Sequence, residues 1–305
     1  MRSIFLGLNF FFILFFSTNI FGQSKNIEIT YKVNSDRSVD FYYSKKEPGS
    51  YTISLSFTRL ENAFNSHYNN IVKGSSGKLI SLKPINKEKG IAFSYKFSFI
   101  RGVLNPKVDS SFVYRLPFKR DTALKVYEMN FLGTTYFGSE LPKNWKAYQF
   151  ITSADTVYAA RKGIVIDVKN KYDFDSISYY TSKKNTILIE HKDGTVASYE
   201  GFAKNKLLVK EGDIVYPQTP LGTLTESNSK NKNKLAFKLY FLIDASKNRK
   251  DESLLNQKSR FQFITTIFLN DVVIETLIPS KTYKVKITND LTFKEFTRKE
   301  RKRFK

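Results

Sequence analysis

The sequence predicts a mostly β protein built from two strand-rich units. Apolar and polar residues alternate soon after the N-terminus, and the chain contains 28 Phe and 18 Tyr residues, which favour strands. Gly, Pro, Asn and Asp residues separate the apolar runs, and there is no long amphipathic helical pattern. A length of 305 residues is sufficient for two domains, each with its own hydrophobic core.

Three segments with period two predict antiparallel strands in the first unit. They span residues 27–33, 51–57 and 93–99, and turn signals lie between them. A similar alternation of apolar runs and turns continues beyond residue 148. We interpret the chain as a signal peptide (1–22), a β-sandwich domain (24–135), a linker (136–147), a second β-sheet domain (148–287) and a basic tail (288–305).

The first 22 residues have the features of a secretory signal peptide. Arg2 precedes an apolar run over residues 4–16, and the small residue Gly22 follows it. The run is too short to predict a membrane span, although a retained N-terminal anchor is the alternative. We therefore expect an exported protein, located in the periplasm, at the cell surface or in the medium. The chain has no cysteine, so no disulfide would stabilise it there.

The chain is strongly basic. Lys and Arg number 50 and Asp and Glu number 28, which gives a net charge of +22. Such a charge attracts polyanions, and an anionic polymer is therefore a candidate partner. The Lys residues are scattered along the sequence rather than gathered in a stripe, which argues against a specific nucleic-acid partner. The basic tail is interpreted as a solvated end, with docking of an anionic polymer as the alternative.

Four segments of the second unit carry a recognisable pattern. They are 157–165 (VYAARKGIV), 187–194 (ILIEHKDG), 208–215 (LVKEGDIV) and 238–241 (KLYF). In order and spacing they resemble the lysostaphin/LytM-type zinc metalloendopeptidases over roughly residues 145–245. The resemblance implies that the C-terminal unit is a LytM-like β-sheet domain with the duplicated hybrid motif. Asp193-Gly194 would form the turn of a hairpin.

The same resemblance implies where zinc would be held. In the family, a His and an Asp from an early loop and the second His of a His-x-His strand bind the metal, and two further His residues help to activate water. The His-x-His strand corresponds to residues 238–241, where alternation places Lys238 and Tyr240 on one face. A Lys ammonium has no lone pair and repels a cation, and a phenol with a pKa near 10 is a rare zinc ligand.

The remaining family positions are also replaced. The early Asp corresponds to Gln149, or to Tyr148 if the spacing is shifted by one residue, and the His of a Tyr-x-His segment corresponds to Gly201. No His occurs between residues 68 and 190, so the early His has no counterpart. His191 matches a structural position at a strand end, and His67 lies in a polar stretch. We therefore predict no catalytic residue, no metal ligand and no cofactor, although zinc is expected for the family.

These substitutions predict a catalytically inactive LytM-type homologue of the cell envelope. It would bind peptidoglycan or a cell-wall hydrolase through a groove formed by the replaced positions together with Tyr199 and Glu200. An active zinc endopeptidase that cleaves peptidoglycan cross-bridges with atypical ligands, such as Glu200 or Tyr240, is the alternative. A surface protein that binds through its positive charge alone is a third interpretation.

Overall fold

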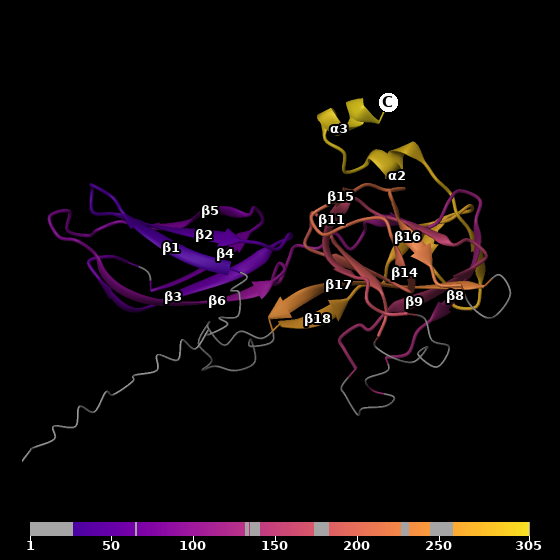
Figure 1. Ribbon diagram of the computed structural model, residues 1–305, viewed down its shortest axis with the longest axis horizontal. Helices are drawn as coiled ribbons and strands as arrows, with labels where there is room; N and C mark the ends of the chain where they lie inside the picture. The colour runs from indigo at the N-terminus through magenta and orange to yellow at the C-terminus, as the bar shows by residue number, and fades with distance from the viewer. Residues whose placement is uncertain are drawn as a thin grey trace, which may run out of the picture.

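The computed structural model describes residues 27–64, 66–131, 134, 141–173, 183–226, 232–244 and 259–304. These residues form five β-sheets and two short helices, so the predicted fold class is confirmed (Figure 1). The proposed signal peptide lies outside the described residues. Within the described residues, no helix is long and apolar enough to cross a membrane.

The N-terminal unit consists of two three-stranded antiparallel sheets that share one hydrophobic core. One sheet contains β1 (Ile27–Val33), β2 (Val39–Lys45) and β5 (Ser76–Leu82), and the other contains β3 (Tyr51–Glu61), β4 (His67–Val72) and β6 (Ala92–Arg101). Phe41, Tyr51 and Ile53 are among its fully buried side chains, because alternate residues of each strand face the opposite sheet. His67 is exposed at the start of β4, where its Nδ1 lies 2.8 Å from the Ser66 hydroxyl.

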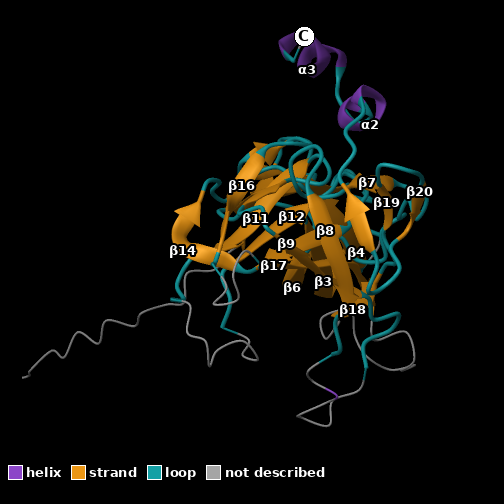
Figure 2. Cartoon of the chain, turned by 90° about the vertical axis from the view of Figure 1, so that its right-hand side faces the viewer, coloured by secondary structure: helices purple, strands orange, loops and turns teal. Residues whose placement is uncertain are grey.

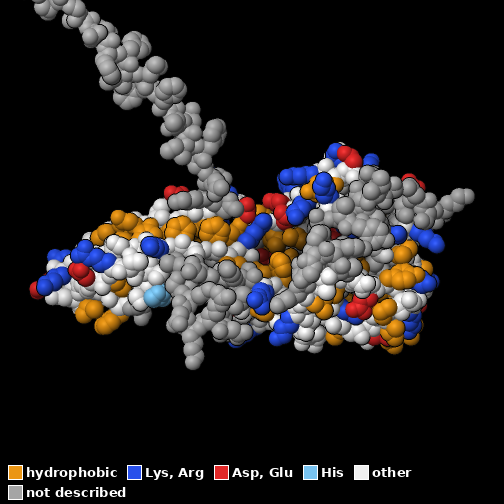
Figure 3. All heavy atoms as spheres, turned by 90° about the horizontal axis from the view of Figure 1, so that it is seen from below, with side chains coloured by type: hydrophobic (Ala, Val, Ile, Leu, Met, Phe, Trp, Pro, Cys, Tyr) orange, Lys and Arg blue, Asp and Glu red, His pale blue; other side chains and the backbone are white. Residues whose placement is uncertain are grey.

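Aromatic side chains are partly exposed between the edge strands β1 and β6. The ring centroids of Tyr31 and Phe93 are 5.0 Å apart, and Tyr31 also contacts Tyr95. Figure 3 shows hydrophobic side chains in a row along one side of this unit. The sandwich core is therefore only partly covered on that side.

The second unit is built on a nine-stranded sheet that Figure 1 shows beside the first unit. Its order is β15-β11-β12-β13-β17-β9-β8-β21, and β18 also pairs with β17. The strands of this sheet are β8 (Ala123–Glu128), β9 (Ala147–Thr152), β11 (Gly163–Lys169), β12 (Thr186–Glu190), β13 (Val196–Glu200), β15 (Ile214–Val215), β17 (Asn233–Asp244), β18 (Ser259–Phe263) and β21 (Thr282–Lys284). The β12–β13 hairpin turns at Gly194, whose φ of +81° suits a residue without a side chain.

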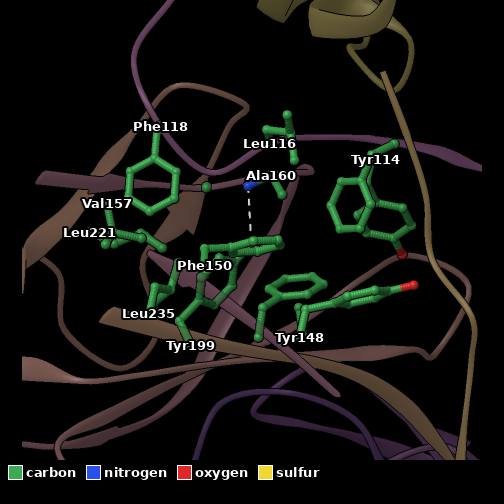
Figure 4. Packing of buried hydrophobic residues seen from close by; sticks show 14 of the residues in the cluster. Tyr114, Leu116, Phe118, Tyr148, Phe150, Val157, Ala160, Tyr199, Leu221 and Leu235 are labelled. Atoms are coloured by element: carbon green, nitrogen blue, oxygen red, sulfur yellow. Dashed lines mark hydrogen bonds between the residues drawn. The ribbon is translucent and has the colours of Figure 1, made fainter. Parts of the chain in front are cut away.

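Two small sheets complete this unit. One contains β10 (Thr156–Tyr158), β16 (Pro220–Leu224) and β14 (Phe202–Leu207), and the other contains β20 (Ile274–Thr276), β19 (Ile267–Leu269) and β7 (Val113–Arg115). A single aromatic-rich core joins the three sheets, and Figure 4 shows part of it.

The structural break between the two units lies earlier than the predicted boundary at residue 135. Strand β8 pairs along its length with β9, and Leu124 and Val126 are buried in the second core. Ala147, which was placed at the end of the linker, is the first residue of β9. The sequence was misleading here because β7 and β8 precede the recognisable segments and have the same strand pattern as the first unit.

Direct contacts join the two units. The backbone N–H and the hydroxyl of Ser50, the residue before β3, both donate to the buried carboxylate of Glu190 on β12, the former over 2.8 Å. The guanidinium of Arg101 donates to the Ile166 carbonyl, and Leu104 forms a β-bridge to Leu242. The N-terminal sandwich is therefore attached to the second unit by hydrogen bonds as well as by the chain.

The basic tail is folded and docked, contrary to the interpretation as a solvated end. Thr288 caps α2 (Asn289–Phe293), and Thr297 and Glu300 form a capping box at α3 (Arg298–Arg303). Buried Arg161 binds Glu295 of the tail over 2.8 and 3.0 Å. Figure 2 shows both helices at one end of the second unit.

Candidate functional site

A groove of about 430 Å³ lies over one face of the large sheet. One end of it is polar and charged, and the other end is mainly aromatic. The groove is lined by Met129, Asn130, Phe131, Trp145, Asp167, Lys169, Lys184, Thr186, Leu188, Ser198, Glu200, Lys238, Tyr240, Phe261 and Phe263. We call this feature the groove.

The register of the sheet places the floor of the groove. Asp167, Leu188, Ser198 and Lys238 are direct cross-strand partners on four adjacent strands, so their side chains share one face. The pairing of β11 shifts between Val165 and Asp167, which leaves Ile166 as the extra residue of a bulge. The bulge brings Asp167 into the same cross-strand row as Lys238.

An ion pair joins Lys238 and Glu200 on the floor of the groove. Their side chains are 23% and 16% exposed, so the pair is partly shielded but still accessible from the groove. Ser198 donates a hydrogen bond of 3.1 Å to the same Glu200 carboxylate. The first His of the His-x-His strand, which helps to activate water in the family, is therefore replaced by a cation that already has a carboxylate partner. The zinc-binding second His of that strand corresponds to Tyr240.

Tyr240 connects the charged end of the groove to its aromatic end. Its ring centroid lies 4.8 Å from that of Phe261 and 5.8 Å from that of Phe263. Burial, reinforced by the neighbouring charges of Glu200 and Asp167, raises the pKa of the phenol. Tyr240 therefore stays protonated at neutral pH and brings both a hydroxyl group and an apolar ring to the lining of the groove.

Trp145 shapes the aromatic end. Its indole N–H donates to the Met129 carbonyl over 2.7 Å, which fixes the ring plane. The ring lies 4.6 Å from Phe263 and 4.9 Å from Phe131, measured between centroids. This end of the groove can cover apolar parts of a ligand such as methyl groups.

The structure brings three of the sequence-predicted residues together and separates the others. Lys238, Tyr240 and Glu200 line the groove. Gln149 lies on β9 in the cross-strand row of Ala236 and Glu200 but is not among the lining residues. Gly201 follows β13 with a φ of +118° and also lies outside the lining.

The expectation that Tyr199 lines the groove is wrong. Strand alternation turns Tyr199 to the opposite face from Glu200, where it is fully buried. Its hydroxyl accepts a 3.0 Å hydrogen bond from the Ala160 amide, drawn as a dashed line in Figure 4. Tyr148, the alternative for the early Asp position, is buried in the same core.

The sequence did not point to the rest of the groove. Ser198 and Thr186 could have been found from the alternation of β13 and β12 once the pairing with β17 was known. Asp167 depends on a bulge that the sequence does not announce. The aromatic wall comes from segments around residues 129–131, 145 and 261–263, which are far apart in the chain.

The residues of the groove do not fit zinc. Lys238 offers a cation instead of a lone pair, and Tyr240 holds its proton. Across the part of the chain that the structure describes, no group of three or more His, Asp or Glu side chains could hold a metal ion. The groove is suited to binding charged and apolar groups rather than to polarising a carbonyl through a metal.

His191 lies outside the groove and is buried. Its Nδ1 lies 2.8 Å from the Lys162 carbonyl, and its ring packs edge-on against Tyr114 at 5.6 Å. Burial, reinforced by the positive charge of Arg161, lowers the pKa of His191 to about 3. The imidazole is therefore neutral at physiological pH, and Nδ1 is the donor to the carbonyl.

Acidification should destabilise the protein through His191. In the unfolded chain His191 takes up a proton as the pH falls below its ordinary pKa of 6.5. In the folded chain it stays neutral until the pH approaches its lowered pKa of about 3. Stability should therefore fall by up to about 1.4 kcal/mol per pH unit across this window, with no further loss from this group below it. Urea unfolding at several pH values measures the slope. His191→Gln should flatten the slope and exposed His67→Gln should not; equal slopes in all three proteins would contradict the assignment.

Comparison with known proteins finds a family match within the second unit. The model of peptidase family M23 matches residues 143–250, about a third of the chain. A solved structure of the SpoIIQ-SpoIIIAH pore forming complex is 17% identical, with 46% of this chain and 84% of that chain covered and a TM-score of 0.26. A zinc containing peptidase from Vibrio cholerae is 14% identical, with 70% of this chain and 75% of that chain covered and a TM-score of 0.24. No curated protein matches the chain.

The family match spans the strands that build the groove floor. It includes β9, β11, β12, β13 and β17, and it contains the four segments that carried the resemblance to LytM-type enzymes. Both structural TM-scores lie below 0.5, so the similarity to peptidase family M23 rests on the family match alone. Residues 143–250 match the model of peptidase family M23, and Lys238 and Tyr240 stand within this match where the resemblance places the two His residues of the His-x-His strand.

Proposed function

We propose that the chain is an exported, non-catalytic M23-type protein that binds the peptide stems of peptidoglycan in the groove. The observation that carries this proposal is the Lys238–Glu200 ion pair on the groove floor. The pair keeps two charged side chains in the groove, and its Lys238 stands where the family has a His of the zinc site. Export rests on the signal-peptide features of residues 1–22.

The charged end of the groove suits a ligand with both amines and carboxylates. Lys238, Lys169 and Lys184 can attract carboxylates, and charge-assisted hydrogen bonds to Lys238 would strengthen in a partly buried site. Asp167 also lines the groove, and its Oδ2 atom has no hydrogen-bond partner among the described residues, so its carboxylate adds a negative charge that can attract an ammonium group. Peptidoglycan stems carry both kinds of group.

The aromatic end complements the rest of such a stem. Trp145, Phe261 and Tyr240 offer apolar surface beside the charged floor. Alanine methyl groups of a stem peptide would be covered there, while the polar ends of the stem reach Lys238 and Asp167. Cleavage is not expected, because the described residues that line the groove provide no set of ligands for a metal ion that could act as a Lewis acid. The Tyr240 phenol is also protonated.

Replacing Lys238 by Met should weaken binding of a soluble stem peptide by about tenfold or more. A charge-assisted hydrogen bond contributes about 1.5–3 kcal/mol, and each 1.4 kcal/mol is about a factor of ten in affinity. Isothermal titration calorimetry with purified muropeptides, together with co-sedimentation with peptidoglycan sacculi, measures the effect. Lys83→Met removes an exposed Lys of the N-terminal unit and is the charge-matched control.

Three results would decide against this function. Equal losses in Lys238→Met and Lys83→Met would assign binding to net charge alone. No enrichment of the wild-type chain on sacculi would remove wall binding. Stoichiometric zinc in protein made without a His tag, lost in Glu200→Ala or Tyr240→Phe together with release of muropeptides, would establish the active zinc endopeptidase instead.

A further inference from the structure

The tail of the chain forms a cationic surface at one end of the M23 domain. Helix α3 contains five basic residues and one acidic residue, Glu300. All five basic side chains are exposed: Arg298, Lys299, Arg301, Lys302 and Arg303. We call these residues and the neighbouring Phe304 the tail surface.

Both carboxylates of this segment are turned inward. Glu295 binds buried Arg161, and Glu300 accepts from Lys162 over 2.7 Å and from the Tyr216 hydroxyl over 2.8 Å. Glu300 also accepts from the backbone of Thr297, which closes the capping box. The acids therefore anchor the tail, and they leave the outward side with positive charge alone.

The outward cations have no counter-charge within the described part of the chain. None of the five takes part in a salt bridge among the described residues, where their one side-chain hydrogen bond runs from Arg301 to the Phe293 carbonyl over 3.1 Å. A dense set of unpaired cations on a fixed helix is a surface for anions. It is held in place by the inward ion pairs rather than by its own helical propensity.

Apolar residues are exposed beside these cations. Phe304 is 52% exposed and packs against Tyr216 and Phe296 at 5.0 and 5.1 Å between ring centroids. Ile214, two residues before Tyr216, is 58% exposed. Exposed aromatic and aliphatic groups next to a cluster of Lys and Arg are typical of surfaces that enter the head-group region of a bilayer.

We propose that the tail surface docks the M23 domain onto a membrane rich in anionic phospholipid. The five cations match phosphate head groups in charge, and Phe304 and Ile214 supply the apolar contact that a soluble acidic polymer would not require. Figures 1 and 2 place α3 at the opposite end of the domain from β18, whose Phe261 and Phe263 line the groove. A docked molecule would therefore leave the groove accessible, and the proposal does not depend on what the groove binds.

The test is co-sedimentation with lipid vesicles, using the chain without residues 1–22, the proposed signal peptide. Vesicles contain either phosphatidylcholine alone or phosphatidylcholine mixed with phosphatidylglycerol. A triple variant, Lys299→Gln, Lys302→Gln and Arg303→Gln, removes three tail charges and keeps Glu295 and Glu300. Each basic residue near an anionic surface strengthens binding, so the triple variant should bind the anionic vesicles at least about tenfold more weakly.

A matched control removes three exposed charges elsewhere. Lys83→Gln, Lys87→Gln and Lys89→Gln change the same net charge in the N-terminal unit and should leave binding nearly unchanged. Phe304→Ser should keep the initial attraction but reduce retention on vesicles at raised salt. Unchanged melting temperatures of the variants verify that the tail is still docked.

Three outcomes would overturn the proposal. Equal binding of the wild-type chain to both kinds of vesicle would remove the role of anionic lipid. Equal losses in the triple variant and its control would assign binding to overall charge. Binding of polyglutamate as tight as that of anionic vesicles, with no effect of Phe304→Ser, would identify an acidic polymer as the partner.

Discussion

Replacing Arg161 by Ala is expected to lower the free energy of unfolding by about 3–5 kcal/mol, because it leaves two carboxylates without their shared cation. Arg161 is only 3% exposed. It pairs with Asp193 over 2.9 Å and with Glu295 over 2.8 Å, and it donates to the Tyr114 hydroxyl over 2.9 Å. Its guanidinium also lies over the Phe112 ring at 3.7 Å, so packing is lost together with charge.

Urea unfolding followed by circular dichroism measures this effect. Arg59→Ala is the control, because Arg59 pairs with Glu61 at a site where both side chains are more than half exposed. That exposed pair should contribute about 0–1 kcal/mol. A loss for Arg161→Ala no larger than for Arg59→Ala would mean that the tail and the hairpin at Asp193 do not depend on this cation.

The docking of the tail illustrates what the sequence could not provide. Glu295 and Glu300 lie 134 and 138 residues from Arg161 and Lys162 along the chain. A run such as RKERKR indicates charge, and only the three-dimensional arrangement selects which charges are paired. The interpretation as a solvated end was correct for the outward cations and wrong for the two carboxylates.

The groove shows both the strength and the limit of strand alternation. Period two correctly placed Lys238 and Tyr240 on one face of β17, and the structure buries Phe237 and Leu239 on the other. The same rule applied to β13 would have excluded Tyr199, because Glu200 beside it faces the groove. Alternation cannot predict the bulge before Asp167 or the aromatic wall, since both depend on how distant segments pair.

The core of the second unit extends beyond the family match on both sides. Leu124 and Val126 on β8 precede residues 143–250, and Phe268 on β19 and Tyr283 on β21 follow them. Strand β8 lies between β9 and β21 in the main sheet. A fragment limited to residues 143–250 would expose the edge of β9 and the apolar surface that these strands cover, so it should not unfold cooperatively.

Phe268→Ala should destabilise the whole domain by about 3–5 kcal/mol, although Phe268 lies outside the family match. The ring is fully buried and contacts Tyr148, Phe150 and Phe237, three core residues on β9 and β17, with centroid distances between 5.7 and 6.0 Å. Val272→Ala, at a 77% exposed position nearby in the chain, should stay within about 0.5 kcal/mol of the wild type. Urea unfolding of both variants distinguishes the two cases. A small effect of Phe268→Ala would mean that β19 only covers the matched strands, whereas the expected loss would establish that the strands outside residues 143–250 complete the core beneath the groove.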